Sequence, residues 1–148
     1  AGSQGISVDY RTLEAFPVQP QEYKQLNYPE LLEADPEIYD RMHSLPWESP
    51  QELDQGFNLH KIQTRLEDYQ TSGNRHLIYF DAFGPRVQPE LWTEEVFVKM
   101  YDELLPAGVL VTYSAKGSVR RAMQAAGFEV ERLPGPPGKR EMLRATKI

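Results

Sequence analysis

Short apolar runs that alternate with helix-like segments are the feature that most constrains the fold of this chain. The runs His76–Phe80 and Val109–Tyr113 are almost wholly apolar. Between them, Pro89–Leu105 repeats apolar side chains at helical spacing after a proline suited to a first turn. Strands that alternate with helices indicate βαβ crossovers. The sequence therefore predicts an α/β fold with a mainly parallel sheet, helices on both faces, and strands covered on both sides.

The remaining elements follow from the same patterns. Alternating or β-rich segments predict strands at Val8–Ala15, Phe57–Ile62, Phe128–Leu133 and Met142–Thr146. Helix-like segments are Gln19–Leu32, which is interrupted by Pro29, and Ser118–Ala126, whereas Arg65–Gln70 is expected to form a short turn of helix. Pro36, Pro46 and Pro50 punctuate the stretch that follows the first of these helices, so we expect that stretch to be rich in loops.

The composition excludes several classes of protein. With 148 residues and 26% charged side chains, the chain has the size and balance of one globular domain, and no apolar run is long enough to cross a membrane. It has no cysteine and only three histidines, so we expect neither disulfides nor a metal site. The lack of cysteine and of a basic, hydrophobic leader leads us to expect a cytoplasmic protein.

Charge is distributed unevenly along the chain. The net charge of -6 disfavours nonspecific binding to nucleic acid, so a polynucleotide would have to meet a local basic patch. From Lys116 onward, basic side chains outnumber acidic ones. The basic residues closest to predicted strand ends are Lys116, Arg120, Arg121, Lys139 and Arg140. These side chains could contact phosphates, although a solvated charged surface would have the same composition.

Three predicted strands end next to residues that can bind a ligand. In α/β folds, ligands bind beyond the carboxyl ends of the strands. Glu14 lies at the end of the first strand, where a carboxylate can accept hydrogen bonds from both hydroxyls of a ribose; a solvated glutamate would look the same. Asp81 follows the strand His76–Phe80, and an aspartate there can also accept hydrogen bonds from turn amides. Tyr113 ends a third strand.

Five segments in order carry a resemblance to a known family. They are Asp81–Pro85, Pro89–Trp92, Val119–Arg121, Ala126–Phe128 and Gly138–Met142. Together they resemble the bacterial tRNA aminomethyl-2-thiouridine methyltransferases of the MnmC/MnmD type. The resemblance implies a Rossmann-like class I methyltransferase that uses S-adenosylmethionine. Its expected substrate is the aminomethyl group on the wobble uridine in the anticodon loop of tRNA.

The resemblance also implies roles for single residues. Glu14 matches the ribose-binding acid of the family, and Asp81 matches its catalytic-site aspartate, beside the cofactor. We expect Asp81 to position the acceptor amine, with Phe83 forming an apolar wall. The aromatic faces of Phe83 and Tyr113 would attract the sulfonium of the cofactor, and Tyr113 would also contact the substrate. The five basic residues named above would contact the tRNA. Trp92 is at helical spacing and is expected in the core.

The sequence departs from the family pattern in two places. The glycine-rich motif that holds the methionine end of the cofactor has no counterpart, because the chain starts just before the second strand of the family's sheet. A strand between those of Glu14 and Asp81 is therefore expected to be missing, and residues 1–148 are interpreted as the C-terminal portion of one methyltransferase domain. The two strands would close the gap or pair between chains. Arg65 stands where an acid near the adenine amine is expected.

Two other functions remain open at this point. A degenerate Rossmann-like domain could bind RNA or protein through its basic surface without being an enzyme. A methyltransferase that acts on a small molecule would share the cofactor but not the tRNA. Binding of S-adenosylmethionine separates the first alternative from the enzyme, and charge reversal at Arg120 and Arg121 separates the second.

Overall fold

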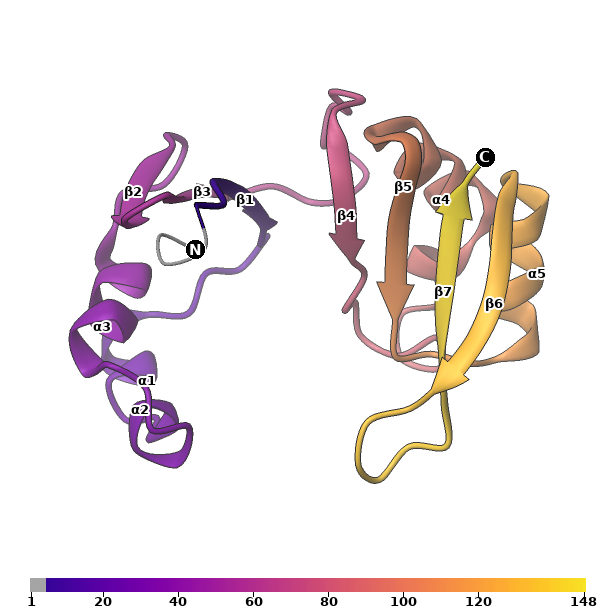
Figure 1. Ribbon diagram of the computed structural model, residues 1–148. Coiled ribbons are helices and arrows are strands. Elements are labelled where there is room, and N and C mark those ends of the chain that lie inside the picture. Colours follow the sequence, from indigo (N-terminus) through magenta and orange to yellow (C-terminus); the bar gives the residue numbers. More distant parts are fainter. Residues whose placement is uncertain (1–4) are drawn as a thin grey trace. The chain divides into compact units, whose positions relative to one another are not determined.

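The computed structural model describes residues 5–148, and its elements are shown in Figure 1. Residues 1–4, which the single-domain interpretation included, lie outside the described part. The chain divides between Tyr69 and Gln70 into two compact units, each with its own sheet. None of the described helices has the length and apolar character that a membrane crossing requires.

The first unit contains a three-stranded sheet in the order β1-β3-β2. Strand β1 (Val8–Leu13) pairs in parallel with β3 (Phe57–Ile62), and β2 (Gln51–Asp54) pairs antiparallel with the other edge of β3. The predicted bounds of β3 are confirmed, while β1 ends two residues earlier than predicted. Strand β2 was not predicted. Its leucine, Leu53, and Leu59 of β3 are both buried.

Three short helices complete the first unit: α1 (Pro20–Tyr23), α2 (Tyr28–Leu31) and α3 (Pro36–Ser44). The helix predicted around Pro29 forms two single turns, because that proline occupies the start of a new helix. The expectation of a loop-rich stretch is wrong for α3. There Pro36 takes the first helical position, and the side chain of Asp35 accepts a hydrogen bond from the backbone of Glu37 at 2.8 Å.

The segment Arg65–Gln70, which was predicted as a short turn of helix, forms a single hydrogen-bonded turn. The backbone N–H groups of Asp68 and Tyr69 both donate to the carbonyl of Arg65, each at 3.2 Å. The turn lies directly after β3, so it brings its side chains to the carboxyl end of the parallel pair β1 and β3.

The second unit contains a four-stranded sheet in the order β4-β5-β7-β6. Its strands are β4 (Arg75–Tyr79), β5 (Leu104–Thr112), β6 (Phe128–Pro134) and β7 (Glu141–Lys147). Strands β4 and β5 are parallel, whereas β7 is antiparallel to both β5 and β6. A mainly parallel sheet is therefore a wrong prediction, because the short connection between β6 and β7 permits only a hairpin.

The helices of the second unit are η2 (Pro89–Trp92), α4 (Glu94–Glu103) and α5 (Gly117–Ala125). The predicted helix Pro89–Leu105 is divided at Thr93, whose extended backbone separates η2 from α4 and whose hydroxyl accepts from the N–H of Val96 at 3.4 Å. Helix α5 ends before Gly127, which has a φ of 102° that favours glycine.

The core of the second unit lies between its sheet and these helices. Leu110, Leu143 and Ala145 share one face of the sheet and are fully buried. Both α4 and α5 lie behind the sheet in Figure 1 and contribute the fully buried Phe97 and Met123.

The helices of the second unit do not cover the opposite face of its sheet (Figure 1). Leu77 is 44% exposed and Tyr79 63% exposed on that face. Within the second unit, the predictions of helices on both faces and of a β4 strand buried on both sides are therefore wrong. The apolar run that predicted burial cannot show which side of the strand the helices cover.

The strands β1 and β4 each lie at the edge of their sheet. Each belongs to the sheet of its own unit, and the prediction that they would close the gap by pairing within one chain stays a prediction. Pairing between copies through these edges stays a prediction.

Candidate functional site

A hollow of about 390 Å³ lies at the carboxyl ends of β4 and β5. Because these two strands are parallel, the residues that follow them meet at one edge of the sheet. Asp81 comes two residues after β4, and Tyr113 follows β5 directly. The lining residues are Asp81, Ala82, Phe83, Gly84, Tyr113 and Lys139. The structure thus brings together four of the predicted site residues: Asp81, Phe83, Tyr113 and Lys139.

The backbone around Asp81 is held from two sides. The indole N–H of Trp92 donates to the carbonyl of Phe83 at 2.8 Å, and the hydroxyl of Tyr113 donates to the carbonyl of Ala82 at 2.8 Å. Trp92 is buried, as predicted, and packs edge-on against the ring of Phe80. The sequence did not indicate that its N–H would fix this loop.

The side chain of Asp81 faces solvent and does not stabilise the turn. It is exposed, and within residues 5–148 no hydrogen bond or ion pair engages its carboxylate. The alternative role, accepting hydrogen bonds from turn amides, is therefore not observed. Phe83 is 72% exposed, so its ring is available to an incoming ligand.

Lys139 reaches the hollow from the loop between β6 and β7. Its ammonium lies 3.9 Å from the centroid of the Tyr113 ring. The loop is closed by two backbone hydrogen bonds, from Gly135 to Arg140 at 3.1 Å and from Lys139 to Pro136 at 2.9 Å. The face of the Tyr113 ring, which was expected to attract a sulfonium, is thus in contact with the ammonium group of Lys139.

The other predicted basic residues lie at the start of α5 and in the loop after β6. Lys116 is the N-cap residue of α5, and its carbonyl accepts from the N–H of Arg120 at 3.0 Å. Arg121 folds back toward Gly117, where an added Cβ would meet its Nη1 at 3.2 Å. Lys116, Arg121 and Arg140 are exposed and Arg120 is half-buried. Of the five predicted phosphate-binding residues, Lys139 alone lines the hollow that contains Asp81.

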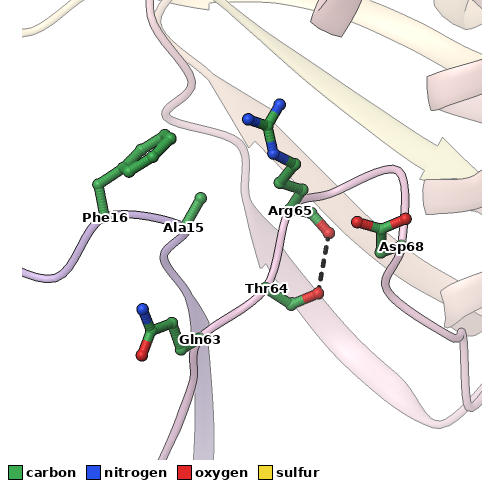
Figure 2. A pocket seen from close by; sticks show the side chains of 6 residues that line it. All are labelled: Ala15, Phe16, Gln63, Thr64, Arg65 and Asp68. Carbon is green, nitrogen blue, oxygen red and sulfur yellow. Dashed lines mark hydrogen bonds between the residues drawn. The ribbon is translucent and has the colours of Figure 1, made fainter.

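A second hollow, of about 330 Å³, lies in the first unit where β1 and β3 end (Figure 2). It is lined by Ala15, Phe16, Gln63, Thr64, Arg65 and Asp68. The guanidinium of Arg65 lies 5.7 Å from the Phe16 ring centroid and 3.5 Å from a carboxylate oxygen of Glu67. Asp68 brings an acid to this hollow, three residues after the position at which the family pattern places one.

Glu14 lies next to this second hollow in sequence, directly after β1. It is exposed, and its Oε1 accepts a hydrogen bond from the N–H of Phe16 at 2.7 Å. One carboxylate oxygen thus fixes the turn after the strand, while Oε2 has no partner among the described residues. No group of three or more histidine, aspartate or glutamate side chains in the described part of the chain is arranged to hold a metal ion.

A comparison with known protein families shows the family of this chain. The family described as S-adenosyl-L-methionine-dependent methyltransferase matches residues 31–148, which is more than half of the sequence. The chain belongs to this methyltransferase family. The match contains Asp81 and its hollow, and it excludes Glu14.

Individual members of the methyltransferase family are similar to parts of the chain. The tRNA 5-methylaminomethyl-2-thiouridine biosynthesis bifunctional protein MnmC of Pseudomonas savastanoi pv. phaseolicola is 38% identical over 79 residues, which is 53% of this chain and 12% of that protein. The MnmC protein of Psychrobacter sp. is 32% identical over 92 residues, 62% of this chain and 12% of that protein. The matched part of the chain therefore spans about an eighth of the length of these relatives.

Solved structures confirm the fold class. MnmC2 from Aquifex aeolicus superposes with a TM-score of 0.63 at 22% identity, covering 94% of this chain and 43% of that one. The antibiotic-resistance methyltransferase Kmr superposes with a TM-score of 0.51 at 17% identity, covering 74% of this chain and 71% of that one. At these identities the likeness concerns the fold, and it confirms the predicted methyltransferase type of α/β architecture.

Each hollow, taken by itself, carries side chains of a kind that could contact one part of S-adenosylmethionine. The exposed carboxylate of Glu14 can accept from ribose hydroxyls, and Phe16 and Asp68 offer a flat apolar face and an acceptor for an adenine amine. The carboxylate of Asp81 and the exposed ring of Phe83 suit the reacting end, where the methyl group is bonded to a positively charged sulfur. Among residues 5–148, no strand is joined to a helix by a glycine-rich turn of the kind that holds the methionine carboxylate.

Proposed function

We propose that residues 1–148 are the C-terminal portion of one S-adenosylmethionine-dependent methyltransferase domain. Its proposed reaction is methylation of the aminomethyl group on the wobble uridine of tRNA, in the cytoplasm. The observation that supports this most directly is the exposed, unpaired carboxylate of Asp81 at a hollow beside Phe83 and Tyr113. The relatives named for 5-methylaminomethyl-2-thiouridine biosynthesis support the choice of substrate.

The acceptor amine must lose a proton before it can attack a methyl group. If its pKa were near that of lysine, about 10.4, deprotonation at pH 7 would cost roughly 4 to 5 kcal/mol. When bound, the cofactor supplies an electrophilic methyl group on a sulfonium. Asp81 would hold the amine by a hydrogen bond and direct its lone pair toward that methyl group, and it can also accept or relay the proton.

The remaining substrate contacts follow from exposed side chains. Phe83 offers a ring on which a flipped-out uridine can stack. Lys116, Arg120, Arg121 and Arg140 would contact phosphates of the anticodon arm. Glu14 would bind the ribose of the cofactor. Association between copies through the free edges of β1 and β4 is part of the proposal, and sedimentation of the purified chain tests it.

The decisive experiment measures methyl transfer by the full chain from radiolabelled S-adenosylmethionine. The acceptor is a synthetic anticodon stem-loop that carries 5-aminomethyl-2-thiouridine at the wobble position. Replacing Asp81 with Asn should lower kcat by about 10²-fold or more, whereas Asp102→Asn, on the exposed surface of α4, should leave it unchanged. Charge reversal at Arg120 and Arg121 should abolish RNA binding.

The outcomes separate the alternatives. If the chain binds RNA but neither binds S-adenosylmethionine nor transfers a methyl group, and an added N-terminal segment with the glycine-rich motif does not restore either activity, it is a binding module and the enzyme proposal fails. Methylation of a free small amine with no preference for RNA would indicate a small-molecule methyltransferase. Equal activity of the Asp81→Asn variant would remove the proposed role of that carboxylate.

A further inference from the structure

Lys139 places a positive charge at the hollow without an acidic partner. Although Asp81 lines the same hollow, no ion pair joins the two side chains among residues 5–148. The ammonium lies instead over the Tyr113 ring, 3.9 Å from its centroid. A cation held by an aromatic face keeps its full charge, because the ring neutralises none of it.

Several contacts keep that charge in place. Tyr113 is fixed through its hydroxyl, which donates to the Ala82 carbonyl at 2.8 Å. The loop that carries Lys139 is closed at its neck, where an added Cβ on Gly135 would lie 2.5 Å from the Lys139 carbonyl oxygen. The same tyrosine thus connects the loop around Asp81 with the loop of Lys139.

We propose that Lys139 serves the methyl transfer by holding a positive charge beside the acceptor amine, which favours the neutral, nucleophilic form of that amine. This inference rests on the proposed function of the hollow. A like charge disfavours the ammonium form of a neighbouring amine, whereas the carboxylate of Asp81 favours it. Asp81 would therefore orient the amine by a hydrogen bond. Lys139 would offset the stabilisation that the Asp81 carboxylate gives to the ammonium form of that amine.

The proton and charge balance of the step is simple. On binding, the ammonium group of the RNA gives one proton to the solvent. The neutral nitrogen then forms a bond to the methyl carbon as the bond between that carbon and sulfur breaks, which leaves a neutral thioether. The product is a secondary ammonium, and because it is again positively charged, Lys139 would also favour its release.

The test measures protons released when RNA binds to the full chain. Isothermal titration calorimetry at pH 7.5 in two buffers of different ionisation enthalpy gives that number. The two ligands are the stem-loop with 5-aminomethyl-2-thiouridine and the same stem-loop with 2-thiouridine. Their difference isolates the amine, because loss of a lysine weakens attraction to phosphates equally for both.

The expected result is that the native chain releases more protons with the amine-bearing RNA than with the control RNA. Lys139→Met should reduce that excess, as expected for a rise of about one unit in the pKa of the bound amine. Lys139→Arg should restore it, because arginine keeps the charge and also stacks on tyrosine. Lys24→Met, at the end of α1, should behave as the native chain does.

Two results would overturn the inference, and they differ from each other. If the native chain does not distinguish the two RNAs, the proposed function itself fails and the role of Lys139 fails with it. If the native chain prefers the amine-bearing RNA but Lys139→Met releases as many protons, the role of Lys139 alone is wrong. Should Lys139→Met not fold, Tyr113→Leu, which removes the seat of the ammonium, is expected to show the same loss.

Discussion

The indole N–H of Trp92 donates a hydrogen bond of 2.8 Å to the carbonyl of Phe83, and so ties the loop of Asp81 to the hydrophobic core of the second unit. Although the side chain of Asp81 is exposed, this hydrogen bond holds the backbone of the loop to which Asp81 belongs. It also links the stability of the core to the geometry of the candidate site.

Replacing Trp92 with Phe should loosen this loop. The change keeps an aromatic ring next to Phe80 but leaves the Phe83 carbonyl without its donor, so we expect a loss of about 1 to 3 kcal/mol in the free energy of unfolding. Hydrogen exchange of the Val87 amide, which donates to the Gly84 carbonyl at 2.7 Å, should accelerate. Tyr79→Phe, at an exposed position, is the control, and an equal effect there would contradict the role of Trp92.

Glu103 is a second position at which one side chain organises a loop. Its buried carboxylate accepts hydrogen bonds from the backbone N–H groups of Ser72 and Gly73 and from the Ser72 hydroxyl, and it lies 3.4 Å from Nε of Arg75. Glu103→Gln removes the charge that these donors and the arginine require, so urea denaturation should show a loss of about 3 kcal/mol. The exposed Glu129→Gln should change stability by less than about 0.5 kcal/mol. Similar values for both variants would show that the buried charge is unimportant.

The stability of the first unit should depend on pH through His43. Burial, and secondarily the positive charge of Lys61, lowers the pKa of His43 below its usual 6.5, while Asp40 opposes the shift. A group whose folded-state pKa is depressed binds its proton more readily in the unfolded chain. The contribution of His43 is therefore complete above pH 6.5 and is lost as the pH falls from 6.5 through the folded-state value.

Two measurements check the prediction for His43. Nuclear magnetic resonance titration should give a pKa below 6.5, and unfolding at pH 7.5 and 5.5 should show lower stability at the acidic pH. His43→Phe keeps a ring in the stack on Tyr23, whose centroid is 4.3 Å away, and should reduce the pH dependence. A folded-state pKa of 6.5 or higher would refute the argument from burial.

Gly135→Ala should displace the loop that carries Lys139. The new methyl group would lie 2.5 Å from the Lys139 carbonyl oxygen and 3.0 Å from the Glu141 nitrogen, distances at which backbone must move. The ring resonances of Tyr113 should therefore shift as the ammonium leaves its face. Arg132→Ala, an exposed change on β6, should leave them unaltered. Unchanged resonances in Gly135→Ala would show that the neck of the loop does not position Lys139.

Short-range sequence patterns predicted the strand and helix bounds that depend on neighbouring residues alone. The bounds of β3 follow from alternation along Phe57–Ile62, and the end of α5 follows from Gly127. The helix after Pro89 was predicted as one piece, because apolar spacing alone does not show that Thr93 takes an extended backbone and caps a new helix. Helix α3 was missed because prolines were interpreted only as interruptions, although Pro36 occupies a first turn in which proline is favoured.

The candidate site was predicted in part. The position of Asp81 after a strand indicated a carboxylate at the carboxyl edge of the sheet, and the structure places it there. The contact between Lys139 and Tyr113 could not be predicted, because the segment 134–140 is rich in glycine and proline and has no periodicity that indicates where its side chains point. Asp68 escaped notice because the pattern of a short turn does not show which side chains point to the hollow with Arg65.

The position of β7 between β5 and β6 has a consequence for synthesis of the protein on the ribosome. Translation delivers β5 and β6 before β7, and until β7 arrives both strands have an edge whose amides and carbonyls lack their partner. Such a nascent intermediate can attract other chains and chaperones. The sheet that supports Asp81 and Tyr113 is therefore completed only after Glu141–Lys147 has left the exit tunnel, which makes maturation of the second unit a late event.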